Sequence, residues 1–526
     1  MRFFQTGGPC VPGRHYMLPA ADRLPGARGL IGRDQYFVVH APRQSGKTTS
    51  LEALAHELTS AGTHVAFRIS CASAKGVVDD VGAVEVNILG AIRGAARGLR
   101  LPAELLPPDP WPDVTESSRI REGLAEWAAL CPLPIVLFFD EIDALYGPSL
   151  VSLLNQIRDG YLARPTPFIA SVALCGLRDV RDYKTAYGGD PAGQHRESPW
   201  NISVKSLRPA DFTLDQVAAL YSQYTDESGQ AFTPDATERV FFYTQGQPWL
   251  VNAIASEITL EMAVPRDQSI TVEHVEQAKE VLVRSRATNL ESLEHRLHEE
   301  RVARVMAPVI QGEIPSYPAF ARDKRYLQDL GLLAVGDGVR VANPIYAEVI
   351  ARTLTAGMQD RVDATLRPED FLATDGRIDM AKVVNGFAAY WTEHGEVVEG
   401  KDYQEAWPHL LLFTYLQAVV NSHGSLTREY AAGRQRADIV IRRPYPSDDG
   451  RPQREVIEVK VWHPRDKADP AVEGLAQLDR YLDRLGLTTG VLAIFDARSG
   501  IPPIPQRTSV TTTTSPAGRT VTLLRG

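Results

Sequence analysis

The strongest constraint on how this chain folds is a short loop that joins an apolar strand to a helical segment. The loop spans residues 40–49 and reads His-Ala-Pro-Arg-Gln-Ser-Gly-Lys-Thr-Thr, after the apolar run 36–39 and before the helical pattern 51–55. This is the context of a phosphate-binding P-loop, in which backbone N–H groups and the helix N-terminus surround a phosphate. In such a loop, Lys47 would reach the β- and γ-phosphates of a nucleoside triphosphate, and the Thr48 hydroxyl would bind Mg²⁺.

One position departs from the usual P-loop pattern. Ala41 stands where the first glycine of GxxxxGK[ST] is expected. Alanine tolerates a left-handed turn poorly, so we expect this loop to enter by a different backbone path. The candidate nucleotide-binding residues of the loop are Pro42, Arg43, Gln44, Ser45, Gly46, Lys47, Thr48 and Thr49.

Composition excludes some classes of protein. The chain of 526 residues carries a formal net charge of −9, which argues against a uniformly basic nucleic-acid coat but permits a local basic groove. Its four cysteines are scattered without metal-ligand spacing, which is typical of reduced thiols in a cytoplasmic protein. The start lacks the apolar core of a signal peptide. The longest apolar run, 410–420, is too short to cross a bilayer, so we expect a cytoplasmic protein with no membrane partner.

Residues 31–206 alternate short apolar runs with helical segments. The runs at 64–69, 134–139 and 168–174 join the first run to predict a parallel sheet covered by helices on both faces. Asp140 and Glu141 follow the third of the four runs directly. An Asp-Glu pair in that place is often only a helix N-terminal cap. Together with Lys47 and Thr48, however, it predicts an Mg²⁺-associated Asp140 and a catalytic Glu141 that orients the attacking water.

The next segments are mostly helical. Thr213 opens a helical pattern, and Gly246-Gln247-Pro248 precedes an apolar helix; this is either a plain helix start or a lid over the nucleotide. A helix ending at Gly331, a hairpin at 336–338 and Asn343-Pro344 suggest a winged helix. Packing is the favoured role for that module over DNA contact, because its Arg/Lys content is modest.

A second group of polar residues lies near the C-terminus. Asp438 begins an apolar strand, and Glu458-Val459-Lys460 lies in another. Strand periodicity sends Glu458 and Lys460 to one face. Two carboxylates and a lysine so placed suit phosphodiester hydrolysis: Asp438 and Glu458 would hold Mg²⁺ or Mn²⁺, and Lys460 would orient water or stabilise charge. Gln477 lies on a later helix, one turn before Tyr481.

The alternative interpretation of this group is a solvated strand, because Glu and Lys alternate on many exposed strands. The order of the residues favours catalysis, with Glu429 as a further acidic candidate and Glu405 as a weaker one on the preceding helix. Arg178, Arg196 and Arg208 lie where a sensor or finger arginine of the ATP site would fall, although a surface salt bridge explains each as well.

With these residues placed, two resemblances can be stated. Residues 1 to about 356 resemble bacterial AAA-like ATPases related to the signal-transduction (STAND) branch of P-loop NTPases. The matching stretches are 15–19, 36–49, 139–143, 244–252 and 343–346. In that family Ala-Pro-Arg-Gln is a usual loop entry, and the Gly-x-Pro formed here by Gly246 and Pro248 is implied to lie near the nucleotide.

The C-terminal part is similar to the PD-(D/E)xK, restriction-endonuclease-like superfamily as found fused to such ATPases. Asp438, Glu458 and Lys460 match its core, and Gln477 with Tyr481 matches a helix motif of some branches. The proline that names the motif is absent, because Ala437 precedes Asp438.

The sequence therefore predicts a multidomain α/β protein, with a P-loop NTPase sheet, a helical lid, a winged helix and a restriction-endonuclease-like domain. The expected parts are an arm (1–30), an ATPase core (31–206), a lid (207–290), a winged helix (291–356), a linker (357–380), a nuclease-like domain (381–500) and a tail or edge strand (501–526). The expected function is an ATP-controlled, metal-dependent DNA nuclease, and this architecture fits defence against foreign DNA. The alternative is a nucleotide switch that binds nucleic acid or protein without cutting. Both functions are compatible with a homo-oligomer, formed either as a ring or only on activation.

Overall fold

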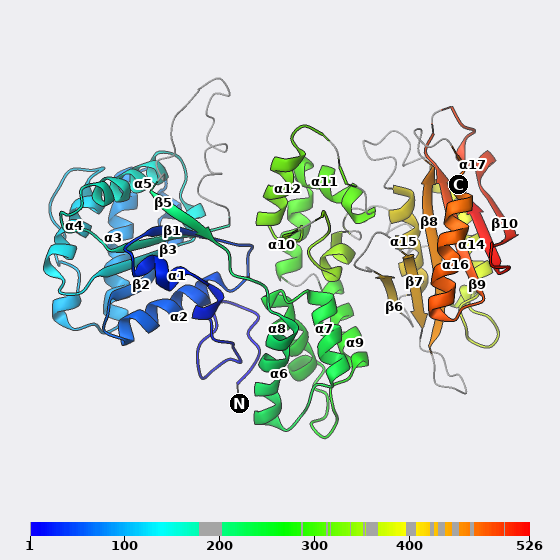
Figure 1. The fold of residues 1–526 in the computed structure, drawn as a ribbon, viewed down its shortest axis with the longest axis horizontal. Helices are drawn as coiled ribbons and strands as arrows, with labels where there is room; N and C mark the ends of the chain where they lie inside the picture. Colours follow the sequence, from blue (N-terminus) through cyan, green and yellow to red (C-terminus); the bar gives the residue numbers. More distant parts are fainter. Residues whose placement is uncertain are drawn as a thin grey trace. The chain divides into compact units, whose positions relative to one another are not determined.

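A computed structural model supplies the fold of the chain (Figure 1). It describes residues 2–177, 202–285, 288–311, 314–315, 317–336, 338–350, 353, 367–395, 407–420, 425–429, 437–443, 452–462, 468–498 and 500–526. The chain divides into two compact units. The first comprises 1–289, 324–337 and 342–345, and the second comprises the remaining stretches up to residue 526. None of the helices formed by the described residues is long and apolar enough to cross a membrane.

A five-stranded parallel sheet organises the first unit. Its strands are β1 (Tyr36–His40), β2 (Val65–Ser70), β3 (Ile135–Asp140), β4 (Ser171–Gly176) and β5 (Ser203–Leu207), in the order β2-β3-β4-β1-β5. The predicted parallel sheet is confirmed. The fourth strand starts at Ser171 and not at residue 168; just before it, the carbonyls of Ile169 and Ala170 accept hydrogen bonds from Arg164.

Helices cover both faces of this sheet, as the continuous apolar runs predicted. On one face, Tyr36 and Val38 pack with buried residues of α3 (Val81–Gly98), α4 (Arg119–Leu130) and α5 (Gly147–Leu162). On the other face, Phe37 and Val39 pack with α1 (Ala27–Ile31) and α2 (Lys47–Ser60). Because all strands are parallel, the residues that follow β1 and β3 lie at the same edge of the sheet.

Four helices follow the sheet in the first unit. They are α6 (Leu214–Ser228), α7 (Pro234–Thr244), α8 (Pro248–Ser256) and α9 (Val272–Arg284). Thr213 caps α6, with its side chain accepting from the Gln216 N–H and the Gln216 side chain accepting in return. Such reciprocal caps fix where a helix begins.

Beyond them lie α10 (Thr288–Leu297), α11 (Glu300–Gln311), α12 (Phe320–Asp329) and a helical stretch at 344–350. The hairpin expected at 336–338 includes residue 337, which is outside the described residues; the winged-helix assignment stays a prediction. Asp323, buried at the start of α12, accepts from Arg301 at 2.7 Å and from Arg304 at 2.9 Å.

The second unit contains a mixed six-stranded sheet, in the order β10-β11-β9-β8-β7-β6. The strands are β6 (Ser425–Glu429), β7 (Ala437–Arg443), β8 (Gln453–Trp462), β9 (Thr489–Asp496), β10 (Ser509–Thr514) and β11 (Thr520–Arg525). Pairing is antiparallel from β6 to β8 and between β10 and β11, and parallel between β8, β9 and β11. Helix α16 (Ala471–Leu485) packs on one face, with Leu478 and Leu482 against Val456 and Leu492.

The other face is covered by α14 (Met380–His394), where Phe387 and Trp391 contact the Phe495 ring. Helix α15 (Trp407–Val420) packs on α14 and on β6 and β7.

Described residues of the predicted linker and tail pack more closely than an isolated linker or tail would. Phe371, in the short helix η7 (Pro368–Phe371), and Ile378 are both buried. At the C-terminal end, β10 is the edge strand of the sheet, which was one of the two alternatives for residues 501–526. Strand β11 lies inside the sheet, between β10 and β9. Two segments of this stretch, 509–514 and 520–525, therefore belong to the sheet.

Candidate functional site

The loop after β1 places its left-handed turns at two positions. Gln44 has φ = 56° and Gly46 has φ = 82°. Ala41 needs no such conformation, because its N–H extends the sheet by donating to the Gly176 carbonyl at 3.4 Å. This is the different loop entry that alanine at position 41 requires. The left-handed backbone of Gly46 favours glycine there, and a Cβ would also meet the guanidinium of Arg23.

Lys47 lies in the concave side of the loop. Its Nζ donates to the carbonyls of Ala41 and Pro42, each at 2.6 Å. Burial lowers the pKa of Lys47, although the charges of Asp140 and Asp143 act to raise it. A desolvated ammonium surrounded by loop carbonyls interacts strongly with an incoming phosphate, because the low local dielectric strengthens the attraction.

Thr48 and Asp140 meet at the carboxyl edge of the sheet. The Thr48 hydroxyl donates to Asp140 Oδ2 at 2.7 Å, and the Asp140 side chain is only 3% exposed. Arg68 Nη1 lies 3.4 Å from the same oxygen. A hydroxyl and a carboxylate oxygen form the hard-ligand set that Mg²⁺ prefers. Their side chains thus fit the predicted ion.

Glu141 follows in a left-handed conformation, with φ = 55°. Its N–H donates to Asp140 Oδ1 at 2.9 Å, and the Ser70 hydroxyl donates to Glu141 Oε2. The strained turn and the serine together hold an exposed carboxylate at the edge of the sheet. Such a carboxylate is placed to orient a water molecule beside a bound phosphate.

These groups line one cavity of about 520 Å³, a size typical of small-molecule sites. Of the predicted nucleotide-binding residues, Gln44, Gly46, Lys47, Thr48, Thr49 and Pro248 line it, together with Asp140 and Glu141. Pro42, Arg43, Ser45 and Gly246 are not among its lining residues. Ser45 instead closes the loop by donating to the Pro42 carbonyl at 2.8 Å.

Gly246 has a positioning role. It has φ = 77°, and its carbonyl accepts from the Phe212 N–H at 2.8 Å. A Cβ at this position would collide with the Phe212 carbonyl. Gly246 therefore fixes the start of α8, and Pro248 at the first turn of α8 reaches the cavity.

Two further parts of the cavity wall carry no recognisable sequence pattern. The N-terminal residues Gln5, Thr6, Gly8, Pro9 and Cys10 line it. The Thr6 carbonyl accepts from Trp249 Nε1 at 2.8 Å, and the Cys10 N–H donates to Thr49 Oγ1 at 3.1 Å. Asn252 of α8 also lines it. The segment lacks periodicity and the asparagine lies within an apolar helix, so neither pattern indicated a site.

The candidate sensor arginines are only partly visible. Arg178 and Arg196 lie outside the described residues. Arg208 follows β5 and donates to the Gln328 carbonyl at 3.1 Å. Burial lowers the pKa of Arg208, while the charges of Asp211 and Asp329 oppose that shift.

In the second unit, β8 and α16 bring three of the predicted residues together. Lys460 Nζ lies 3.1 Å from Glu458 Oε1 and donates to Gln477 Oε1 at 2.8 Å. Glu458 is fully buried, and Gln477 is 8% exposed. This burial does not fit the solvated-strand alternative, in which the alternating charges would face water. Tyr481, one turn after Gln477, is also buried.

The other acidic candidates are described only in part. Asp438 lies in β7 next to Ile439, which pairs with Ile457, so its backbone is beside that of Glu458. Glu429 ends β6. The side chains of Asp438 and Glu429, and all of Glu405, lie outside what the structure describes. Among the side chains that it does describe, no three His, Cys, Asp or Glu groups converge on a metal position.

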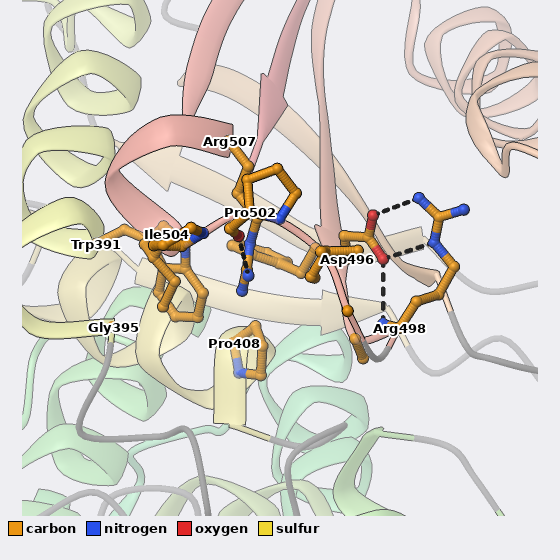
Figure 2. Close-up of a pocket in the computed structure, with 13 residues that line it drawn as sticks. Trp391, Gly395, Pro408, Asp496, Arg498, Pro502, Ile504 and Arg507 are labelled. Atoms are coloured by element: carbon orange, nitrogen blue, oxygen red, sulfur yellow. Dashed lines mark hydrogen bonds and ion pairs between the residues drawn. The ribbon is translucent and has the colours of Figure 1, made fainter.

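The second unit also has a cavity of about 570 Å³ at the end of β9 (Figure 2). Trp391 and Ile504 lie on one side of it, and the Asp496–Arg498 ion pair, at 2.6 Å, lies on the other. None of Glu458, Lys460 and Gln477 lines this cavity. It is therefore separate from the cluster on β8 and α16.

The sheet order, the loop after β1 and the Asp-Glu pair after β3 together fit the P-loop NTPase fold. The second sheet is a separate mixed α/β architecture. No protein-family model and no curated protein matches the chain.

Three of the solved structures that are similar to the chain are covered over most of their own length. The Walker-type ATPase PABY2304 of Pyrococcus abyssi is 14% identical, with 66% of this chain and 99% of that chain covered and a TM-score of 0.46. The ORC1 protein of Aeropyrum pernix in complex with DNA is 12% identical over 66% of this chain and 96% of that one, with a TM-score of 0.34. The RuvB Holliday junction branch migration motor of Thermotoga maritima is 15% identical over 61% and 90%, with a TM-score of 0.33.

Proposed function

We propose that the first unit binds and hydrolyses ATP. The observation that carries this proposal is the convergence of Lys47, Thr48, Asp140 and Glu141 on one cavity at the carboxyl edge of a parallel sheet. These are the cation, hydroxyl and two carboxylates that phosphoryl transfer to water requires.

Each residue has a distinct role in the proposed reaction. Lys47 exchanges its bonds to two loop carbonyls for bonds to the β- and γ-phosphates and neutralises their charge. Thr48 and Asp140 would hold Mg²⁺, which when bound supplies further neutralisation of the phosphate oxygens. Glu141, held by Ser70, orients the attacking water.

The test is ATP binding and phosphate release by the full chain and by Lys47→Ala and Glu141→Gln. Lys75→Ala is a matched control, because Lys75 is exposed on the first unit and does not line the cavity. We expect Lys47→Ala to lose binding, and Glu141→Gln to bind ATP but turn it over at least about 100-fold more slowly. Equal activity of all four proteins would refute the proposal.

We further propose that the second unit cleaves DNA phosphodiester bonds. The specific observation is Lys460, which contacts both a fully buried carboxylate and the amide of Gln477. A lysine held this way has one fixed position, which suits the orientation of water or the stabilisation of a developing negative charge. Asp438 and Glu458 would hold Mg²⁺ or Mn²⁺, and the adjacent backbones of β7 and β8 support that pairing.

Cleavage of plasmid and linear DNA, with Mg²⁺ or Mn²⁺ and with or without ATP, tests this second activity. The variant is Glu458→Ala/Lys460→Ala, and Glu473→Ala on the exposed side of α16 is its control. We expect the double variant alone to stop cutting, and Lys47→Ala to change the ATP dependence. Intact DNA and RNA with every protein, while ATP is still hydrolysed, would favour a switch that binds its partner without cleavage.

A nuclease controlled by ATP fits defence against foreign DNA, as the resemblance to ATPase–nuclease fusions implies. Plaque counts of a broad phage panel on cells with the wild-type protein or the Glu458→Ala/Lys460→Ala variant test this role. Equal counts for every phage would contradict it.

A further inference from the structure

Asn252 combines burial with a free acceptor in the wall of the first cavity. It is 7% exposed, and its Nδ2 donates to the Pro248 carbonyl one turn earlier at 2.8 Å. A carbonyl only accepts, so this contact fixes which end of the amide faces Pro248. Among the described residues, Asn252 Oδ1 has no hydrogen-bond partner, and the residue lines the cavity.

A buried amide oxygen without a donor is unfavourable unless something else supplies one. The cavity around it is suited to a flat apolar group, because Pro248 and the Trp249 side chain line it beside Asn252. The Trp249 N–H is already bonded to the Thr6 carbonyl, so it does not supply the missing donor. Lys47, Thr48 and Arg68 add a cationic and polar portion to the same cavity.

We infer that Asn252 Oδ1 accepts a hydrogen bond from the amino group of the adenine base and so contributes to nucleotide selectivity. This inference rests on the proposed ATP site and adds to it the recognition of the base. The 6-amino group of adenine is a donor, whereas a 6-oxo purine presents an acceptor oxygen at that position. Two acceptors facing each other repel, so inosine triphosphate would bind less tightly than ATP.

The experiment compares the affinities of ATP, inosine triphosphate and purine riboside triphosphate, which lacks the 6-substituent, by calorimetry with Mg²⁺ present. Every protein carries Glu141→Gln to slow turnover, and wild type here means asparagine at position 252. For the wild type we expect ATP to bind about five- to tenfold more tightly than purine riboside triphosphate. Asn252→Ala should lose that preference, with a ratio near one, because it weakens ATP and leaves the analogue unchanged.

Two further variants separate base recognition from folding. Asn252→Leu keeps the approximate shape of the side chain but removes its acceptor, so it should lose the preference for ATP as Asn252→Ala does. Asn385→Ala removes an asparagine that makes the same bond, Nδ2 to the Ala381 carbonyl at 2.8 Å, on the exposed side of α14. This control should keep the wild-type ratio.

An Asn252→Ala or Asn252→Leu protein that keeps the wild-type preference would overturn the inference and leave the ATP site standing. If the wild type bound none of the three nucleotides, the proposed ATP site itself would fail, and the inference with it. A wild type that bound ATP and purine riboside triphosphate equally would contradict base recognition alone.

Discussion

Replacing Lys460 with methionine separates a structural from a catalytic role of the cluster on β8 and α16. Glu458 is 0% exposed and Lys460 is 21% exposed, with 3.1 Å between their charged atoms. Removing one member of a buried pair costs about 3–5 kcal/mol, and because water reaches Lys460 we expect about 2–3 kcal/mol here. Methionine keeps the apolar stem that lies against Gly474, so the loss reflects the charge.

The change in stability is best followed with a probe that reports only the second unit, because a protein with two compact units need not unfold in one step. Amide hydrogen exchange of β8 and β9 in the full chain reports that unit, and 2–3 kcal/mol corresponds to about a 30- to 150-fold loss of protection. The double variant Glu458→Gln/Lys460→Met removes both charges of this pair, so it should recover at least half of the lost stability.

Catalysis predicts that neither variant cuts DNA, although the double variant regains protection. A purely structural cluster predicts that cutting returns together with stability. Cleavage at the wild-type rate by the double variant would therefore refute the catalytic reasoning.

Three further predictions concern the first unit. Burial lowers the pKa of Lys47 below its ordinary value of 10.5, so Lys47 loses its charge at a lower pH than a free lysine does. ATP affinity should therefore fall over that alkaline range, and calorimetry in buffers of different ionisation enthalpy should show proton uptake on binding. Lys47→Met should show neither effect. A methyl group at Gly331 (φ = 76°) would press into Pro42 of the P-loop, whereas a methyl group at Gly336 (φ = 119°) would meet open space. Gly331→Ala should therefore weaken ATP binding at least about tenfold more than Gly336→Ala, which carries backbone strain alone. Cys10 lines the cavity and burial raises its pKa, so it should react slowly with maleimide, and more slowly still when ATP is present. Cys131 does not line the cavity, so ATP should not change its labelling. Peptide mass spectrometry measures the labelling of both cysteines.

The parts that the sequence predicted well are those in which local pattern and tertiary environment agree. Residues 36–39 are apolar on both faces because helices cover both sides of β1, so a continuous run indicated a buried parallel strand. Asp140 was predictable for the same reason: it ends such a strand, and parallel strands bring their carboxyl ends to one edge.

The parts that it missed depend on contacts between distant residues. The Thr6 carbonyl meets Trp249 across more than two hundred positions of sequence, and a backbone acceptor has no side-chain signature. Strand β10 was ambiguous because an edge strand exposes one row of its residues to water. Its run Thr511 to Thr514 is mostly exposed and resembles a polar tail until β11 pairs with it.

The start of α8 shows why two interpretations of one motif can both describe the molecule. The sequence allowed two interpretations of Gly246 and Pro248, namely a plain helix start or a lid over the nucleotide. Gly246 fixes the backbone against Phe212, and Pro248 occupies the first turn of the helix. Those local constraints set the direction of α8, and that direction brings Pro248, Trp249 and Asn252 into the cavity wall. The helix start is thus the physical means by which three side chains of α8 reach the proposed nucleotide, and base recognition by Asn252 depends on it.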